Sequence, residues 1–348
     1  VPGVSGYERA VGALAYRELE PYVDRVEFDD FGNVISLREA SVEGGPRVML
    51  AGHMDEIGLI VKHVDEKGFA YFQPVGGVSP RSLFSQPVKI HTGRGVINGL
   101  VNCKPPDTPE EEKKMPELRD FFIDVGVGSR EEAERLGVKV GDQVTFERPF
   151  ATLGDGSLVA SRAIDDRVGV CVVIETMKQL AGEAIEANVY GVPVVQEEVG
   201  CRGAQVAAYR IAPDMAIAVD VTSALDIPGV PEREHVTRIG AGPAIKIMDQ
   251  VYFLGLISNP RIRELLVSTA EEEGIPYQME ILGRGSTDAA TIHLTREGVP
   301  SGVISIPTRY IHSYELISVK DVVNAVKLLT ATIRRIPKDL SLKPRSIQ

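Results

Sequence analysis

Residues 47–55 read RVMLAGHMD, an apolar run that ends in a histidine and, two positions later, an aspartate. Three more apolar runs end in polar residues: VYGVPVVQEE at 189–198, MAIAVD at 215–220 and GVISIPTRYIH at 302–312. Short runs of this kind predict buried strands. Because amphipathic segments alternate with them, we expect a mainly parallel sheet in an α/β fold. Pro193 interrupts the second run, which predicts an edge strand or an irregular one there.

Three segments have the patterns of amphipathic helices: 7–19, 260–273 and 321–336. Ser5 and Glu8 have the spacing of a capping box before the first of them. Asn259 and Pro260 can cap and begin the second, and Gly274 can end it.

The stretch from 61 to 160 differs from the rest of the chain in its composition and in its predicted elements. It is rich in Gly and Pro, contains short β-type pieces, and offers one helix candidate, SREEAERLG at 129–137. We therefore expect a small β domain over 61–160, inserted into an α/β domain formed by 1–60 and 161–348. Within it, 104–117 (KPPDTPEEEKKMPE) is too polar and proline-rich to pack, so a mobile loop is expected.

Composition excludes several classes of protein. The 348 residues carry a formal net charge of -11 and no dense basic stripe, so nucleic acid is not an expected partner. No apolar stretch has the length needed to span a bilayer, and the first residues lack the pattern of a signal peptide, which predicts a cytoplasmic protein with no membrane partner. The three cysteines have unrelated spacings that fit neither disulfides nor a C-x-x-C metal site.

Metal-binding types of residue stand where the predicted strands end, which is where open α/β sheets bind ligands. These residues are His53, the pair Glu197 and Glu198, Asp220, and His312, and Asp165 and Asp166 stand directly before another apolar helix. Imidazoles with carboxylates suit Zn, Co or Mn. Two such ions need a bridging carboxylate, and five ligands with one bridge leave each ion open coordination for water or substrate.

The adjacent glutamates allow two roles. We assign Glu198 as a metal ligand and Glu197 as the catalytic base that takes a proton from the attacking water and passes it to the leaving amine. Asp55, two residues beyond His53 on an extended segment, can hold the second N–H of that imidazole. Each of these residues, taken alone, could have a purely structural role, as a helix cap, a core histidine or a solvent-exposed acid. Their joint placement at four strand ends predicts a metal hydrolase, with its substrate left open.

Six motifs, read together, resemble the M42 family of metallopeptidases, which includes the tetrahedral (TET) and deblocking aminopeptidases. They are GHMDEIG (52–58), SRAIDDRVG (161–169), VQEEVGCRGA (195–204), AVDVT (218–222), GSTDA (285–289) and RYIHS (309–313). The likeness runs from Val4 to Val322, nearly the whole chain.

The resemblance implies a three-layer αβα co-catalytic metallopeptidase domain, interrupted by a β-barrel dimerisation domain. It implies two Zn or Co ions per subunit at the residues named above, with Asp165 rather than Asp166 as the bridge. It also implies removal of N-terminal residues from short peptides, and assembly of dimers into a hollow tetrahedral dodecamer. Thr287, Asp288, Arg309 and Tyr310 lie in motif segments and are expected to shape the pocket for the first side chain.

Two departures and two rival functions remain. Cys201 stands where the family usually has an aliphatic residue, and Pro193 lies in a strand that usually lacks proline. One rival function is that of a related amidohydrolase or dipeptidase, or of a glycanase. A glycosidase needs only a pair of carboxylates, so the two histidines would have no role in it. A catalytically silent assembly protein is the other, against which the complete ligand set argues. The preferred N-terminal residue, the native metal and the choice between dimer and dodecamer do not follow from the sequence.

Overall fold

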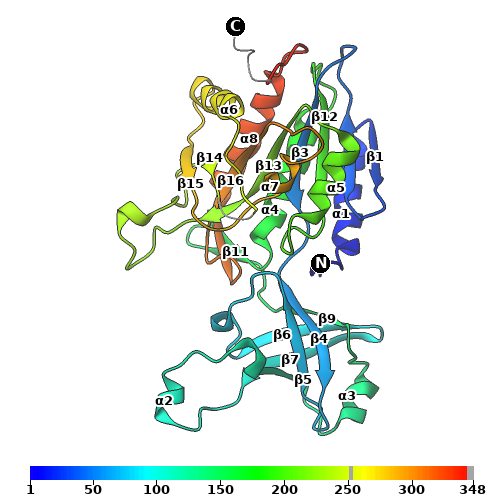
Figure 1. Cartoon of the computed structure of the whole chain (residues 1–348), viewed down its shortest axis with the longest axis vertical. Helices are drawn as coiled ribbons and strands as arrows, with labels where there is room; N and C mark the ends of the chain where they lie inside the picture. Colours follow the sequence, from blue (N-terminus) through cyan, green and yellow to red (C-terminus); the bar gives the residue numbers. More distant parts are fainter. Residues whose placement is uncertain (251–253, 343–348) are drawn as a thin grey trace.

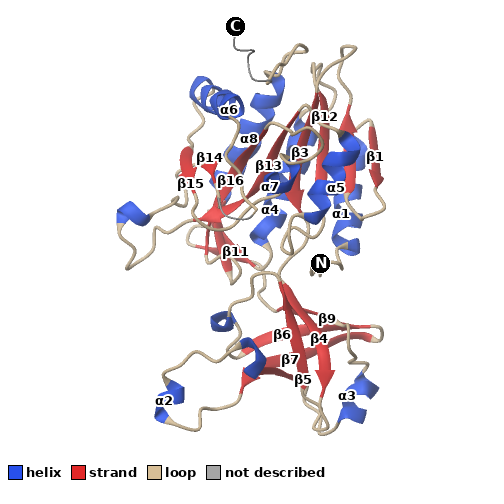
Figure 2. Cartoon of the chain, viewed as in Figure 1, coloured by secondary structure: helices blue, strands red, loops and turns tan. Residues whose placement is uncertain are grey.

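The protein has an α/β body and a β-barrel body, seen in Figure 1 at the top and bottom of the view. The computed structural model describes residues 1–250 and 254–342. Helices cover both faces of the upper sheet, which confirms the expected three-layer α/β fold (Figure 2). Among the described residues, no helix combines the length and the apolar character that crossing a membrane requires.

The large sheet contains eleven strands among the described residues. Nine follow the order β1-β2-β12-β3-β13-β16-β17-β11-β10, and β14 and β15 extend it beside β16. Its strands β12, β3, β13 and β16 run parallel, so their carboxyl ends share one edge. The bounds are β1 (Arg25–Phe28), β2 (Val34–Arg38), β3 (Arg47–His53), β10 (Ala151–Leu153), β11 (Leu158–Ser161), β12 (Asn188–Val194), β13 (Met215–Ser223), β14 (Ala244–Met248), β15 (Gln278–Ile281), β16 (Ser301–Arg309) and β17 (Glu315–Ser318).

Side chains of β3 alternate between two hydrophobic cores, as a strand buried on both faces requires. Val48 and Leu50 pack with one set of helices, and Met49 and Ala51 pack with the other. The first set comprises α1 (Arg9–Leu19), α4 (Ile164–Gln179), α6 (Pro260–Glu272) and α8 (Val319–Arg334), and the second comprises α5 (Arg202–Ile211) and α7 (Ala289–Ile292).

The barrel is closed by six antiparallel strands in the order β4-β5-β8-β7-β6-β9 around its own apolar core. Its elements are β4 (Gly58–Val64), β5 (Ala70–Val75), β6 (Gln86–Thr92), β7 (Gly95–Cys103), α2 (Pro109–Glu112), β8 (Phe121–Asp124), α3 (Arg130–Leu136) and β9 (Gln143–Phe146). Short 3-10 turns are η1 (Glu20–Tyr22), η2 (Pro80–Ser82), η3 (Leu118–Asp120) and η4 (Glu232–Glu234). The inserted domain was expected over 61–160; the barrel strands run from 58 to 146, and β10 and β11 pair within the large sheet. The expected loop at 104–117 includes the short helix α2.

One predicted helix cap is confirmed and another is wrong. The Asn259 side chain accepts a hydrogen bond from the backbone N–H of Arg261. Ser5 and Glu8 do not form the expected capping box: α1 begins at Arg9 without a side-chain cap. The Ser5 hydroxyl instead donates to Asp55, 50 residues away, because the N-terminal segment lies against the end of β3.

Pro193 lies in an interior strand, not at an edge, because β12 pairs with both β2 and β3. The pairing with β2 ends at Gly191, however, so the missing N–H of Pro193 falls beyond that ladder. Of the two alternatives, an edge strand is wrong for β12 as a whole, but at Pro193 the strand has no ladder partner on the β2 side, which explains how the proline is accommodated.

A buried ion cluster joins β14 to β15. Lys246 and Glu280 face each other in the strand register, with 2.9 Å between Nζ and Oε1, and Asp249 Oδ2 lies 3.6 Å from the same Nζ. All three side chains are at most 1% exposed. Burial alone would lower the pKa of Lys246, but attraction to the two acids raises it, so the lysine stays charged.

Replacing this buried cation should destabilise the fold more than replacing an exposed one. Lys246→Met leaves two buried carboxylates without a counter-charge, and we expect a loss of about 3–5 kcal/mol in the free energy of unfolding. The control Lys89→Met removes an exposed pair with Glu147 and should cost about 1 kcal/mol or less. Urea denaturation measures both, and equal losses would contradict the assignment of a stabilising cluster.

Candidate active site

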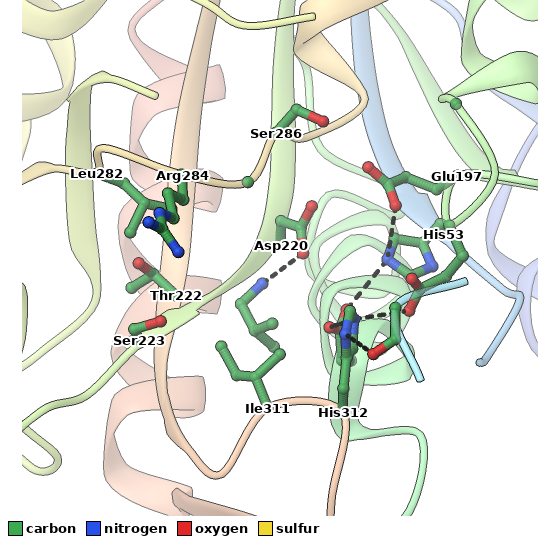
Figure 3. Close-up of a pocket in the computed structure, with 16 residues that line it drawn as sticks. His53, Glu197, Asp220, Thr222, Ser223, Leu282, Arg284, Ser286, Ile311 and His312 are labelled. Carbon is green, nitrogen blue, oxygen red and sulfur yellow. Dashed lines mark hydrogen bonds and ion pairs between the residues drawn. The ribbon is translucent and has the colours of Figure 1, made fainter. Parts of the chain in front are cut away.

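The residues predicted from the strand ends meet at one cavity of about 340 Å³ (Figure 3). His53 is the last residue of β3, Glu197 and Glu198 follow β12, and Asp220 lies in β13. His312 follows β16, and Asp165 stands in the first turn of α4. The residues that line the cavity include His53, Asp165, Glu197, Glu198, Asp220 and His312.

The Asp165 carboxylate lies between the two histidines. Its Oδ1 is 3.1 Å from Nε2 of His53, and its Oδ2 is 3.2 Å from Nε2 of His312. Glu198 Oε1 is 3.1 Å from the same His312 nitrogen. Burial alone would raise the pKa of Asp165, but hydrogen bonds from the two imidazoles hold it below its usual range.

The carboxylate of Asp166, the other candidate for the bridging ligand, accepts hydrogen bonds from the backbone. Its Oδ2 accepts a hydrogen bond from the N–H of His53 at 3.0 Å, and its Oδ1 accepts one from the N–H of Gly169 at 2.9 Å. The carboxylate therefore joins the end of β3 to the first turns of α4. It also lies close enough to His53 and Asp220 for the three to form a possible metal-binding group.

Asp55 holds three segments of the site together. Its Oδ1 lies 3.4 Å from Nδ1 of His53, and its backbone carbonyl lies 3.2 Å from the same nitrogen. The carboxylate also accepts the backbone N–H groups of Glu197 at 3.0 Å and Glu198 at 3.1 Å, and the hydroxyl of Ser5 at 2.7 Å. The contacts with the glutamates and with Ser5 were not predicted from the sequence.

Glu315 was also missed, although it stands only three residues beyond His312. Its Oε2 accepts a hydrogen bond from the backbone N–H of Asp165 at 3.1 Å, and its Oε1 accepts one from that of His312 at 3.0 Å. Burial, with repulsion from Asp165, raises the pKa of Glu315 to about 8. One buried carboxyl group thus fixes the backbone beneath two candidate ligands.

The electrostatics of the cavity fit bound cations. Burial raises the pKa values of Glu197 and Asp220, and neighbouring carboxylates raise them further against the attraction of His53. Burial would lower the pKa of His312, but contacts with Asp165 and Glu198 raise it to about 11. Carboxylate oxygens and imidazole nitrogens in these positions form a donor set suited to divalent transition metals, which would offset the concentrated negative charge.

Comparisons with known proteins agree with this donor set. A sequence model of the M42 glutamyl aminopeptidases matches residues 32–328. The chain belongs to this family. A solved aminopeptidase of Desulfurococcus kamchatkensis is 44% identical, with a TM-score of 0.95 over 100% of this chain and 96% of that one.

Two further relatives cover nearly the whole chain. The lysyl aminopeptidase of Pyrococcus furiosus is 38% identical over 347 residues, 98% of this chain and 96% of the relative. The TET1 peptidase of Pyrococcus horikoshii, described as able to assemble into a tetrahedron or a large octahedral shell, is 32% identical with a TM-score of 0.84 over 96% of each chain. This protein is therefore a peptide-hydrolysing aminopeptidase of the M42 family, whose members use divalent metal ions.

The four residues expected to shape the substrate pocket of this aminopeptidase are not among those that line the cavity. Thr287 and Asp288 are buried, and burial raises the pKa of Asp288 to about 7. Arg309 forms two hydrogen bonds with the Asp226 carboxylate, at 2.9 and 2.6 Å. Tyr310 is half-exposed and directly precedes the lining residue Ile311.

Other residues line the rest of the cavity, and Figure 3 shows Leu282, Arg284, Thr222 and Ser223 across it from His53 and Glu197. The other lining residues include Thr222, Ser223, Leu282, Arg284, Ser286 and Ile311. Thr222 and Ser286 belong to the motifs AVDVT and GSTDA, so the motifs were the available signal, but they did not indicate which side chains face the cavity.

Cys201 contacts the candidate base directly. Its thiol lies 3.1 Å from Glu197 Oε1, to which it donates, and 3.4 Å from the carbonyl oxygen of Thr287. The side chain is buried, and burial raises the pKa of the thiol. This cysteine of the M42 aminopeptidase is therefore a packing residue that also contacts Glu197, with little thiolate character.

Glu315→Gln should weaken the site without altering any residue that lines the cavity. A glutamine has one acceptor oxygen, so the N–H of either Asp165 or His312 loses its partner. We expect about 1–3 kcal/mol less stability and about 10-fold weaker metal binding, measured by denaturation and by calorimetric metal titration. The exposed Glu39→Gln, beside Arg25, is the control. A Glu315 variant with wild-type metal affinity would rule out this role.

Proposed function

We propose that this aminopeptidase holds two divalent metal ions, Zn or Co with Mn as a further option. His53 and Asp220 would hold one ion, His312 and Glu198 the other, and Asp165 would bridge them. The observation that carries the proposal is that Asp165 presents one oxygen to each imidazole. The backbone hydrogen bonds of Asp166 favour Asp165 as the bridge.

When bound, the ions would supply Lewis-acid activation of water and polarise the scissile carbonyl. Glu197 acts as the base that takes the proton from the attacking water and delivers it to the leaving amine. Its carboxylate lines the cavity, with Oε2 at 3.7 Å from Nε2 of His53. Asp55 positions Glu197 and Glu198 through their backbone N–H groups and orients His53.

The substrates are short peptides with a free N-terminus. The acidic cavity attracts the ammonium group of the N-terminal residue, and N-acetylation removes that charge. A family described as glutamyl aminopeptidases includes a lysyl aminopeptidase among the relatives, so membership does not set the preferred residue. Thr287, Asp288, Arg309 and Tyr310 stand outside the lining, and any influence of theirs on selectivity would act through the residues that face the cavity.

We propose further that the chain forms dimers through the barrel and a tetrahedral dodecamer in the cytoplasm. The likeness to the TET1 peptidase supports the assembly. Light scattering should give twelve times the mass of one chain, and a purely monomeric protein would contradict the proposal.

Removing the metal should remove activity on free-amine substrates. Protein stripped with a chelator should not cleave aminoacyl-p-nitroanilides, and refilling with Co or Zn should restore cleavage of the free-amine forms only. Release of p-nitroaniline measures both. Cleavage of the acetylated forms would favour an amidohydrolase, and no cleavage with any metal would favour the silent assembly protein.

Glu197→Gln should separate catalysis from metal binding. The variant keeps the shape of the side chain but cannot take a proton, so kcat should fall by about 10²- to 10⁴-fold. Metal content, measured by atomic emission, should stay at the wild-type level. Asp220→Asn, which changes a proposed ligand, should lower the metal content instead. Loss of metal from the Glu197 variant would contradict the division of roles.

A further inference from the structure

A loop of the inserted barrel reaches the active site. Residues 74–78 (PVGGV) leave β5 and approach the cavity, and Gly77 is the one lining residue that comes from the barrel in the described part of the chain. Its carbonyl oxygen lies 3.2 Å from Nδ1 of His312. Since a carbonyl only accepts, Nδ1 carries the proton, and Nε2 faces Asp165 and Glu198.

The loop has room for glycine alone beside these side chains. A Cβ on Gly77 would lie 2.5 Å from Nδ1 and 2.6 Å from Cε1 of His312, and all three of its nearest atoms belong to that ring. A Cβ on Gly76, which has a positive φ of 75°, would lie 3.1 Å from Oε2 of Glu198 and 2.7 Å from a methyl group of Ile57. The two glycines therefore contact the two ligands proposed for one metal ion.

His312 cannot easily move away from this loop, because the barrel also holds the residue that follows it. Arg148, just beyond β9, donates to the Ser313 carbonyl at 2.6 Å, to the Ser82 carbonyl at 3.3 Å and to Gln86 Oε1 at 3.1 Å. Its side chain is buried against Phe146. The backbone directly after His312 is thus also attached to the barrel.

We propose that the Gly76–Gly77 loop is a positioning element for His312 and Glu198, so that the inserted barrel sets the affinity and geometry of the metal position these residues share. This inference rests on the proposed dinuclear site. It gives the barrel a role inside each subunit, in addition to any role in assembly. The position shared by His53 and Asp220 has no contact with this loop among those described for Gly76 and Gly77.

The test compares Gly77→Ala with Gly93→Ala. Gly93 lies in the turn between β6 and β7, where an added Cβ meets nothing within 4 Å, and its φ is not positive. Chelator-stripped proteins are titrated with Co²⁺ by calorimetry, and the visible absorption of Co²⁺ reports the ligand geometry. We expect Gly77→Ala to weaken one of two binding events by about 10- to 100-fold and to change the absorption bands. Gly93→Ala should match wild type.

If Gly77→Ala does not fold, a second variant still tests the inference. Gly77→Ala/His312→Ala removes the ring that the new methyl group meets, so it should fold even if Gly77→Ala does not. In the His312→Ala background, the Gly77 change should have no further effect on metal affinity. A Gly77→Ala protein with wild-type affinities and spectrum overturns the inference, as does a double variant that remains unfolded. A wild-type protein that binds fewer than two ions overturns the proposed function instead.

Discussion

The site depends on the hydrogen bonds that the buried carboxylate of Asp55 accepts. This carboxylate joins the N-terminal segment through Ser5, the end of β3 through His53, and the segment after β12 through the N–H groups of both glutamates. Burial alone would raise the pKa of Asp55, but these hydrogen bonds hold it below its usual value, so it remains an acceptor. Losing it would leave several buried donors without a partner, which costs more than one hydrogen bond contributes.

Two buried acidic clusters of the protein differ in how their negative charge is balanced. Beneath the sheet edge, Glu280 and Asp249 are balanced by Lys246, a cation supplied by the chain itself. The carboxylates of the cavity form no ion pair with a lysine or arginine in the described part of the chain, and the ionisable partners they contact are the two imidazoles and the thiol of Cys201. Because no lysine or arginine forms an ion pair with this cluster, it favours external cations, which is the physical reason why this donor set suits a metal centre.

The barrel and the α/β body meet at the same histidine. Gly77 contacts the ring of His312 and Arg148 holds the backbone that follows it, so the inserted domain is part of the active-site structure. Such a contact explains how a domain with its own apolar core can affect chemistry in the neighbouring one. The close approach itself requires both glycines, because a side chain on Gly77 would occupy the volume of the His312 ring and one on Gly76 would press against Ile57 and Glu198.

The sequence alone determined the α/β fold, the inserted β domain and five of the residues that meet at the cavity, because apolar periodicity and strand ends are local properties that parallel pairing brings to one edge. Between Asp165 and Asp166 only the family resemblance chose, because the sequence offered both acids. It did not determine which acid contacts which imidazole. The capping role expected of Ser5 was wrong because a partner 50 residues away competes for its hydroxyl. Glu315, Gly77 and the cavity wall were likewise decided by tertiary structure. Their roles arise from long-range approach of side chains and backbone, which spacing along the chain does not encode.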